Sequence, residues 1–267
     1  MNELSLFSGA GGGLLGTKLL GWRNIGYVEH ERYCQQIISQ RIKDGILDEA
    51  PIFGDIDRFI ESGAAKKYKG FVDVVTAGFP CQPFSVAGKQ AGEDDPRNKW
   101  PQTIQCIRDI RPRYAFLENV PGLLNSGYFP EILGSLAEAG FDARWVVLGA
   151  DDVGAPHRRK RLWIVADSDT GHGIQSDKTL RAGGLTSDNG SQHVADTNSE
   201  RRCLRETNGQ DAKDVGQSPR RSEYGVWDAE PNVGRVANGV ANRVDRLRAI
   251  GNGQVPLVVT QAWGILK

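Results

Sequence analysis

The chain has 267 residues with 33 basic and 33 acidic side chains, so its formal net charge is zero. A neutral chain lacks the overall positive field of many nucleic-acid-binding proteins, so any such contact must come from a local patch. No stretch of about 18 apolar residues occurs, so we expect no membrane-spanning helix. Because the first residues also lack the basic and apolar stretches of a secretory signal, we expect a cytoplasmic protein.

The first 166 residues alternate between short apolar strands and helical segments. Strands are predicted at residues 2–7, 24–29, 72–77, 114–118, 143–148 and 161–166, and helices at 10–20, 32–43, 98–111 and 129–139. Strands that are continuously apolar, such as 72–77, are typical of a parallel sheet that is buried on both faces. We therefore predict an α/β fold, with a mostly parallel sheet and helices on both of its faces.

The composition changes near residue 167. Only nine of the next 66 residues are strongly apolar or aromatic, which is too few for an independent core. This region is either a disordered insertion or a loop-rich lobe that becomes ordered against a partner. Gly-Asn-Gly at 251–253 is expected to break the chain before a helix at 255–266 that packs on the first domain. The predicted organisation is a first domain part at 1–166, a separate region at 167–232 and a return segment at 233–267.

A glycine-rich turn with the pattern Gly11-x-Gly13-x-x-Gly16 follows the first strand and opens a helix. Glycines let a ligand approach the backbone, and helix N-terminal amides favour an anionic group. Glu29 ends the next strand, where a carboxylate can accept from both hydroxyls of a ribose. An adenosine-containing cofactor is favoured, and NAD and S-adenosylmethionine both fit. Asp55 either accepts from an adenine amino group or, as is favoured in isolation, caps the following turn.

Cys81 lies in a loop with the sequence Gly-Phe-Pro-Cys-Gln-Pro-Phe-Ser, directly after the strand at 72–77. The carboxyl ends of strands in open α/β sheets face the ligand crevice, and two prolines stiffen this loop. Nearby positive charge would lower the pKa of such a thiol and favour the nucleophilic thiolate. The four cysteines and four histidines form no cluster with metal-ligand spacing, so we expect neither a disulfide scaffold nor a metal site.

Five motifs, taken together, resemble those of the DNA (cytosine-5)-methyltransferase family. In chain order they are Phe7-Ser8-Gly9-Ala10-Gly11-Gly12, the Cys81 loop at 78–85, Glu118-Asn119-Val120, His157-Arg158-Arg159-Lys160-Arg161 and Gly251-Asn252-Gly253-Gln254-Val255-Pro256. The resemblance covers residues 1–166 and about 233–267. It implies a Rossmann-like methyltransferase sheet, a small target recognition lobe at 167–232, and a prokaryotic or phage-infected cell as the source.

The resemblance implies transfer of a methyl group from S-adenosylmethionine to C5 of cytosine in a specific duplex DNA sequence. Cys81 would add to C6 of the base, which makes C5 able to accept the methyl group. Glu118 would hold N3 and the exocyclic amine in a dry pocket that raises its own pKa. Arg161 would contact the base carbonyl, and Arg159 would lie close to the thiolate and a phosphate.

The same resemblance implies S-adenosylmethionine as the cofactor, with no metal. The implied cofactor-binding residues are Phe7, Ser8, Gly9, Gly11, Gly12, Glu29, His30, Asp55, Ile56 and Asn252. Two positions depart from the family, because Gly13 and His30 stand where apolar or aromatic side chains are common. They predict a modest affinity for the cofactor. In the arginine motif His157 replaces the usual glutamine.

The implied partners are double-stranded DNA and, if the enzyme is not a solitary modifier, a cognate restriction endonuclease, with no membrane. The target base must be flipped out of the duplex before a thiol can reach it. The implied DNA-binding residues are Gln82, Ser85, Lys89 and Arg97. An RNA cytosine-5 methyltransferase and a catalytically idle DNA-binding relative remain as alternatives, although Cys81 and Glu118 argue against the idle relative. A nicotinamide dehydrogenase would need neither of these two residues in this arrangement.

Overall fold

The computed structural model describes residues 1–80, 98–168 and 243–267. The strands are β1 (Asn2–Leu6), β2 (Arg23–Val28), β3 (Ile52–Phe53), β4 (Val74–Ala77), β5 (Tyr114–Asn119), β6 (Asp142–Leu148) and β7 (Arg161–Asp167). The helices are α1 (Gly12–Leu19), α2 (Arg32–Lys43), α3 (Ile56–Glu61), α4 (Ala64–Lys67), α5 (Trp100–Ile110), α6 (Phe129–Glu138), α7 (Arg243–Asn252) and α8 (Pro256–Leu266). Short 3-10 helices lie at Pro121–Asn125 and Asp151–Val153.

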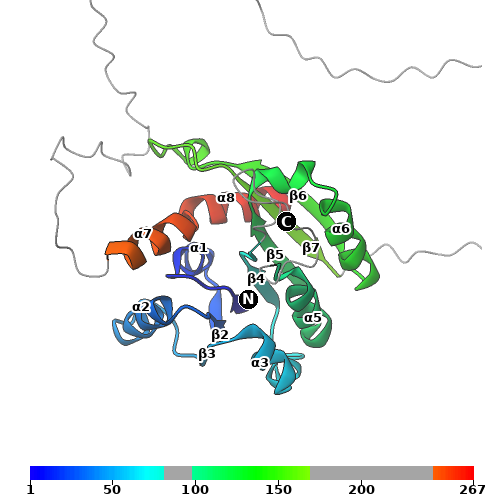
Figure 1. Cartoon of the computed structure of the whole chain (residues 1–267), viewed down its shortest axis with the longest axis horizontal. Helices are drawn as coiled ribbons and strands as arrows, with labels where there is room; N and C mark the ends of the chain where they lie inside the picture. The colour runs from blue at the N-terminus through cyan, green and yellow to red at the C-terminus, as the bar shows by residue number, and fades with distance from the viewer. Residues whose placement is uncertain (81–97, 169–242) are drawn as a thin grey trace, which may run out of the picture. The chain divides into compact units, whose positions relative to one another are not determined.

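The seven strands form one sheet in the order β3-β2-β1-β4-β5-β7-β6 (Figure 1). Neighbouring strands from β3 to β5 are parallel, whereas β7 runs antiparallel to both β5 and β6. The strand order reverses at β1, which pairs with both β2 and β4. Ligands bind outside the carboxyl ends of the strands at such a reversal. The predicted α/β sheet is confirmed, and so is its mostly parallel character.

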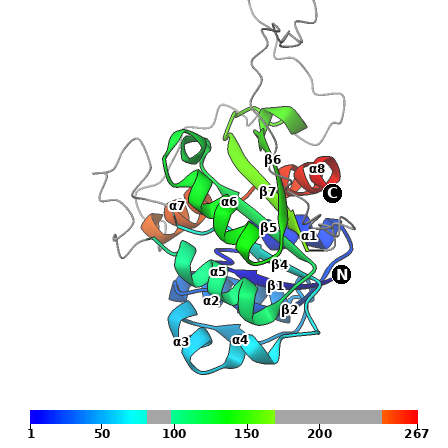
Figure 2. The ribbon, with the colours of Figure 1, turned by 90° about the vertical axis from the view of Figure 1, so that its right-hand side faces the viewer.

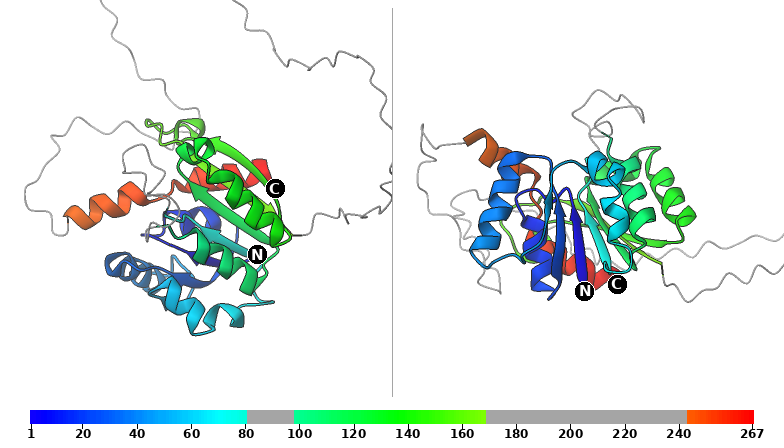
Figure 3. Two further views of the ribbon diagram at one scale, coloured as in Figure 1. Left: turned by 45° about the vertical axis from the view of Figure 1, so that its right-hand side comes forward. Right: turned by 90° about the horizontal axis from the view of Figure 1, so that it is seen from below.

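Two layers of helices cover the sheet (Figures 2 and 3). Helices α3, α4, α5 and α6 pack on one face, and α1, α2 and α8 pack on the other. Each layer of helices encloses a hydrophobic core, the first core beneath α3 to α6 and the second core beneath α8. The side chains of β4 alternate between them, with Val75 and Ala77 in the first core and Val74 in the second. This alternation follows from the two-residue period of a strand, and it decides which polar side chains share a face.

Helix α8 carries the second core, although it comes from the far end of the chain. Its Trp263 is buried, with its ring 4.7 Å from that of Trp22, 5.2 Å from Tyr114 and 5.4 Å from Phe116. The helix also packs along α1, where Gly16 allows a close approach to Val259. The residues that follow β1 are therefore held in place by the last helix.

Three helices were not predicted, namely the short helices α3 and α4 and the longer helix α7 that precedes α8. Helix α7 also continues through Gly251 and Asn252, where a break was expected, and ends one residue before Gly253. A glycine in a helix costs only about 1 kcal/mol, so a single glycine does not force a helix to end. Among the described helices, none combines the length and apolar character needed to cross a bilayer. Apart from Asp167 and Ser168, the region 167–232 lies outside the described residues.

Candidate active site

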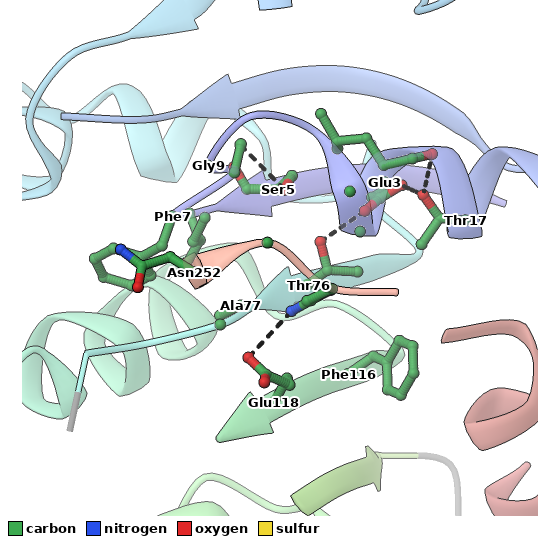
Figure 4. Close-up of a pocket in the computed structure, with 18 of the residues that line it drawn as sticks. Glu3, Ser5, Phe7, Gly9, Thr17, Thr76, Ala77, Phe116, Glu118 and Asn252 are labelled. Atoms are coloured by element: carbon green, nitrogen blue, oxygen red, sulfur yellow. Dashed lines mark hydrogen bonds between the residues drawn. The ribbon is translucent and has the colours of Figure 1, made fainter. Parts of the chain in front are cut away.

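A row of polar side chains lies on the sheet face that α1 and α8 cover. Because the strands are in register, alternation places Glu3 and Ser5 of β1, Thr76 of β4 and Glu118 of β5 on this one face. They line a pocket that is closed by the glycine turn and by residues 252–254, and Figure 4 shows this arrangement. The pocket holds about 540 Å³ of empty space, including its open mouth. It opens where the strand order reverses, which is the expected position for a ligand site.

The glycine turn between β1 and α1 has an unusual backbone. Phe7, Gly9 and Gly11 all have positive φ angles, of 53°, 56° and 91°. A positive φ is costly for a residue with a side chain, so Phe7 is held in a strained conformation by its surroundings. Gly11 is the N-cap of α1 and has no side chain with which to cap the first turn. The first amides of α1 are therefore suited to receive a ligand acceptor.

Glu29 connects the glycine turn to the end of β2. Its Oε2 accepts a hydrogen bond from the Gly9 amide at 2.6 Å, and its Oε1 accepts one from the Glu31 amide at 2.7 Å. Burial raises the pKa of Glu29, and these two amide donors oppose the shift. Each carboxylate oxygen can accept two hydrogen bonds, so Glu29 keeps acceptor capacity for the hydroxyls of a ribose.

His30 and Asp55 lie together beyond Glu29, at a second hollow that Phe53 also lines. Asp55 Oδ1 accepts from the Arg58 amide at 3.1 Å, so Asp55 is the N-cap of α3, as expected for this residue in isolation. This hydrogen bond is the main cause of its lowered pKa. His30 Nδ1 lies 3.5 Å from Asp55 Oδ2, with most of the imidazole exposed. The Ile56 side chain is buried in the core, which leaves only its backbone for a ligand.

Glu118 is held from two sides at the end of β5. Its Oε1 lies 2.9 Å from Arg161 Nε, and its Oε2 accepts a hydrogen bond from Gln254 Nε2 at 3.3 Å. The side chain is only 12% exposed. Burial raises the pKa of Glu118, and the charge of Arg161 is the largest effect that opposes this shift. The expected raised pKa is thus confirmed in direction.

The two arginines of the motif at 157–161 have different partners. Arg161 forms the ion pair with Glu118. The guanidinium that we expected to contact the base carbonyl is therefore bound to a carboxylate in this structure. Arg159, which has a positive φ of 34°, donates from one guanidinium nitrogen to the carbonyl oxygens of Gly251 and Gly253. Burial lowers the pKa of Arg159. Arg159 therefore fixes the segment that precedes α8.

The start of the Cys81 loop is anchored beside Glu118. Phe79 is buried with its ring 5.0 Å from that of Trp100, and its carbonyl accepts from Asn119 Nδ2 at 3.0 Å. The Lys99 amide donates to the Pro80 carbonyl at 3.4 Å. The loop thus leaves the sheet at a fixed point, next to the residue that follows Glu118. Cys81 and the expected DNA-binding residues Gln82, Ser85, Lys89 and Arg97 lie outside the described residues.

The family model for C-5 cytosine-specific DNA methylases matches residues 1–217. The chain belongs to this family. The Type II methyltransferase M.NgoMIV of Neisseria gonorrhoeae is 34% identical over 168 residues, which are 61% of this chain and 51% of that protein. M.HaeII of Haemophilus aegyptius is 34% identical over 173 residues, which are 63% of this chain and 51% of that protein. The chain spans about half the length of these curated relatives.

Solved structures support the fold. A DNMT2 mutant of Spodoptera frugiperda superposes with a TM-score of 0.52 at 23% sequence identity, over 67% of this chain and 53% of that one. Together with the family match, this confirms the Rossmann-like methyltransferase fold that the five motifs implied. Within the part of this methylase that the structure describes, no group of three or more potential metal ligands occurs.

Two residues of the methylase site were missed by the sequence reasoning, namely Asn119 and Gln254. Both belong to recognised motifs, but only Glu118 and Asn252 were singled out within them. The sequence signal that could have pointed to Gln254 is the glycine at position 13, where the family often has a larger side chain. A Cβ atom at residue 13 would overlap Gln254 Oε1, so this glycine makes room for the glutamine amide. A side chain at residue 13 would have to share this space with the Gln254 side chain.

Proposed function

We propose that this methylase transfers a methyl group from S-adenosylmethionine to C5 of cytosine in a specific duplex DNA sequence. The observation that carries the proposal is the placement of Glu118. This buried carboxylate faces the pocket, is paired with Arg161, and immediately precedes the asparagine that anchors the Cys81 loop. Family membership supports the same reaction.

The pocket residues, together with Glu29 behind the glycine turn, fit the proposed cofactor. The glycine turn leaves open space beside Gly9, Glu29 keeps acceptor sites for a ribose, and Phe7 and Asn252 line the pocket. S-adenosylmethionine, when bound, supplies an activated methyl group. The chain's own contribution is to hold the cofactor at the carboxyl end of β1 and to exclude water from Glu118.

In the proposed reaction the Cys81 thiolate adds to C6 of the flipped cytosine, and the displaced electron pair makes C5 nucleophilic. Glu118 hydrogen-bonds N3 and the exocyclic amine, which stabilises the charge that the ring accepts during the attack. The ion pair keeps Arg161 close enough to reach the base carbonyl. After C5 has taken the methyl group, a base such as water removes the C5 proton, and the thiolate leaves C6.

Contacts with DNA are assigned to Gln82, Ser85, Lys89 and Arg97, and sequence recognition to the region at 167–232. Arg159, which holds the segment before α8, is assigned a positioning role, and Asp55 and Ile56 are assigned to the adenine. We also propose a cytoplasmic location and a cognate restriction endonuclease, in line with the Type II names of the relatives.

Sequencing of 5-methylcytosine in bacterial DNA, with and without expression of the protein, tests the proposal and identifies the recognition site. We expect methylation at one short sequence, and its loss in Cys81→Ser, which should keep its affinity for the cofactor. A duplex with 5-fluorocytosine at the target should form an adduct that resists denaturation, because no C5 proton can leave. Methylation of tRNA but not of DNA would favour the RNA alternative, and turnover by Cys81→Ser near the wild-type rate would refute the covalent mechanism.

A further inference from the structure

Gln254 occupies a crevice that three glycines leave open. A Cβ atom on Gly12 would meet the Gln254 backbone, and one on Gly13 would meet its side-chain oxygen. A Cβ atom on Gly78 would lie 3.0 Å from Gln254 Nε2 and 3.0 Å from Glu118 Oε2. These glycines come from two separate places in the chain, since Gly12 and Gly13 begin α1 and Gly78 directly follows β4. The crevice is therefore shaped to bring one side-chain amide to Glu118.

The Gln254 amide donates to Oε2 of Glu118, which is the acceptor that the proposed reaction needs for the exocyclic amine of cytosine. Arg161 holds Oε1 of Glu118, and Gln254 Nε2 donates to Oε2. A buried acceptor that loses its donor carries the cost of lost hydration. Oε2 could accept a second hydrogen bond, but it shares a narrow crevice with the Gln254 amide, so an amino group that approaches Oε2 from the pocket competes with that amide for the same space.

The segment that carries Gln254 is fixed independently of that amide. Arg159 binds the carbonyl oxygens of Gly251 and Gly253, and α8 begins directly after Val255. The backbone at Gln254 is thus held on both sides, while the side chain has its own rotatable bonds. Such a side chain can move away from Glu118 without movement of the backbone.

We propose that the Gln254 amide is a placeholder for the exocyclic amine of the target cytosine. In the base-free enzyme it donates to Oε2 of Glu118, and it gives up this position when the flipped base enters. Gln254 is a positioning residue, because it acts through Glu118. The inference rests on the proposed function and adds to it the residue that competes with the base.

Gln254→Met tests the placeholder, because methionine has a similar length and no donor. The probe is a duplex that carries the recognition site found by sequencing, with either cytosine or an abasic nucleotide at the target. With cofactor product bound, the variant should bind the cytosine duplex about tenfold more tightly than wild type, because the base now satisfies an acceptor that is otherwise unpaired. Affinity for the abasic duplex should stay unchanged, and Gln261→Met, at an exposed position on α8, should match wild type with both.

A second readout is the pH dependence of kcat/KM, which reports the ionisation of groups in the free enzyme. Loss of the amide donor should raise the pKa of Glu118 in the free enzyme, and because Glu118 must carry a proton to donate to N3, the alkaline limb of kcat/KM should move to higher pH in Gln254→Met alone. Equal or weaker binding of the cytosine duplex, with unchanged cofactor affinity and melting temperature, would overturn the placeholder and leave the proposed function standing. If the wild-type protein methylates no cytosine at all, the proposed function itself fails and the placeholder fails with it.

Discussion

Replacement of Glu3 by glutamine should abolish a pH-dependent loss of folding stability. Glu3 is fully buried in β1, where Oε2 accepts from Thr17 Oγ1 at 2.5 Å and from Asn24 Nδ2 at 2.6 Å. Its Oε1 accepts from Thr76 Oγ1 at 2.6 Å. The Thr17 hydroxyl also lies 3.1 Å from the Leu14 carbonyl, so it has two acceptors for one hydrogen. A proton on Glu3 would resolve this competition, because the carboxyl could then donate to Thr17.

Burial raises the pKa of Glu3 from an ordinary value of 4.5 to about 7, against the effect of its three hydrogen bonds. The folded protein therefore binds a proton between these two values that the unfolded chain has released. Stability from this group is present below the unfolded pKa, falls as the pH rises, and is lost above about 7. The pKa difference corresponds to about 3 kcal/mol, of which roughly 2 kcal/mol falls between about pH 5.5 and about pH 8.

Urea denaturation of wild type and Glu3→Gln at these two pH values measures the effect. The free energy of unfolding of the variant, relative to wild type, should rise by roughly 2 kcal/mol from the lower to the higher pH, because glutamine does not titrate. Glu61→Gln is the matched control, since Glu61 is exposed at the end of α3. If the difference between Glu3→Gln and wild type is the same at both pH values, the buried carboxyl is ionised throughout and the reasoning is wrong.

Three further substitutions, one of them with a matched control, test the packing and the cofactor pocket. Gly16→Ala should cost about 1–3 kcal/mol in chemical denaturation, because the new methyl group would lie 2.5 Å from Val259 Cβ. Gly134→Ala in α6, whose added methyl group meets no described atom within 4 Å, should keep or gain stability, and equal losses in both variants would contradict this account. Trp263→Ala should cost about 3–5 kcal/mol, and an unchanged melting temperature would show that α8 is not essential to the second core. Glu29→Gln should weaken S-adenosylmethionine binding about 10- to 100-fold by calorimetry, and unaltered affinity would exclude Glu29 from the site.

Six of the seven strands were predictable because their apolar runs are long enough to show a pattern, whereas β3 has only two residues. The position of Glu118 followed in the same way, since it ends a strand that was recognised at 114–118. Helices α3 and α4 span six and four residues, which is too short for a helical period to emerge. Hydrophobic patterns in a single sequence identify helices and strands best where the helix or strand is long and uniformly buried.

The contacts that complete the site were not predictable from local patterns. Glu3 meets Thr76 across 73 positions, and Gln254 meets Glu118 across 136. Within its own strand Glu3 resembles an ordinary polar interruption, and its burial depends on partners that only the folded sheet brings together. The same holds for Arg159, whose position in a basic run suggests an exposed or phosphate-binding side chain but whose guanidinium binds two backbone carbonyls.

Helix α8 is far from α1 in the sequence, yet its Trp263 packs against Trp22, Tyr114 and Phe116. A state in which α8 is undocked would expose those aromatic rings and would also remove Gln254 from the glycine crevice. Loss of the second core and opening of the pocket would therefore occur in the same event. The cooperativity of folding thus protects the pocket from being present in a half-assembled form.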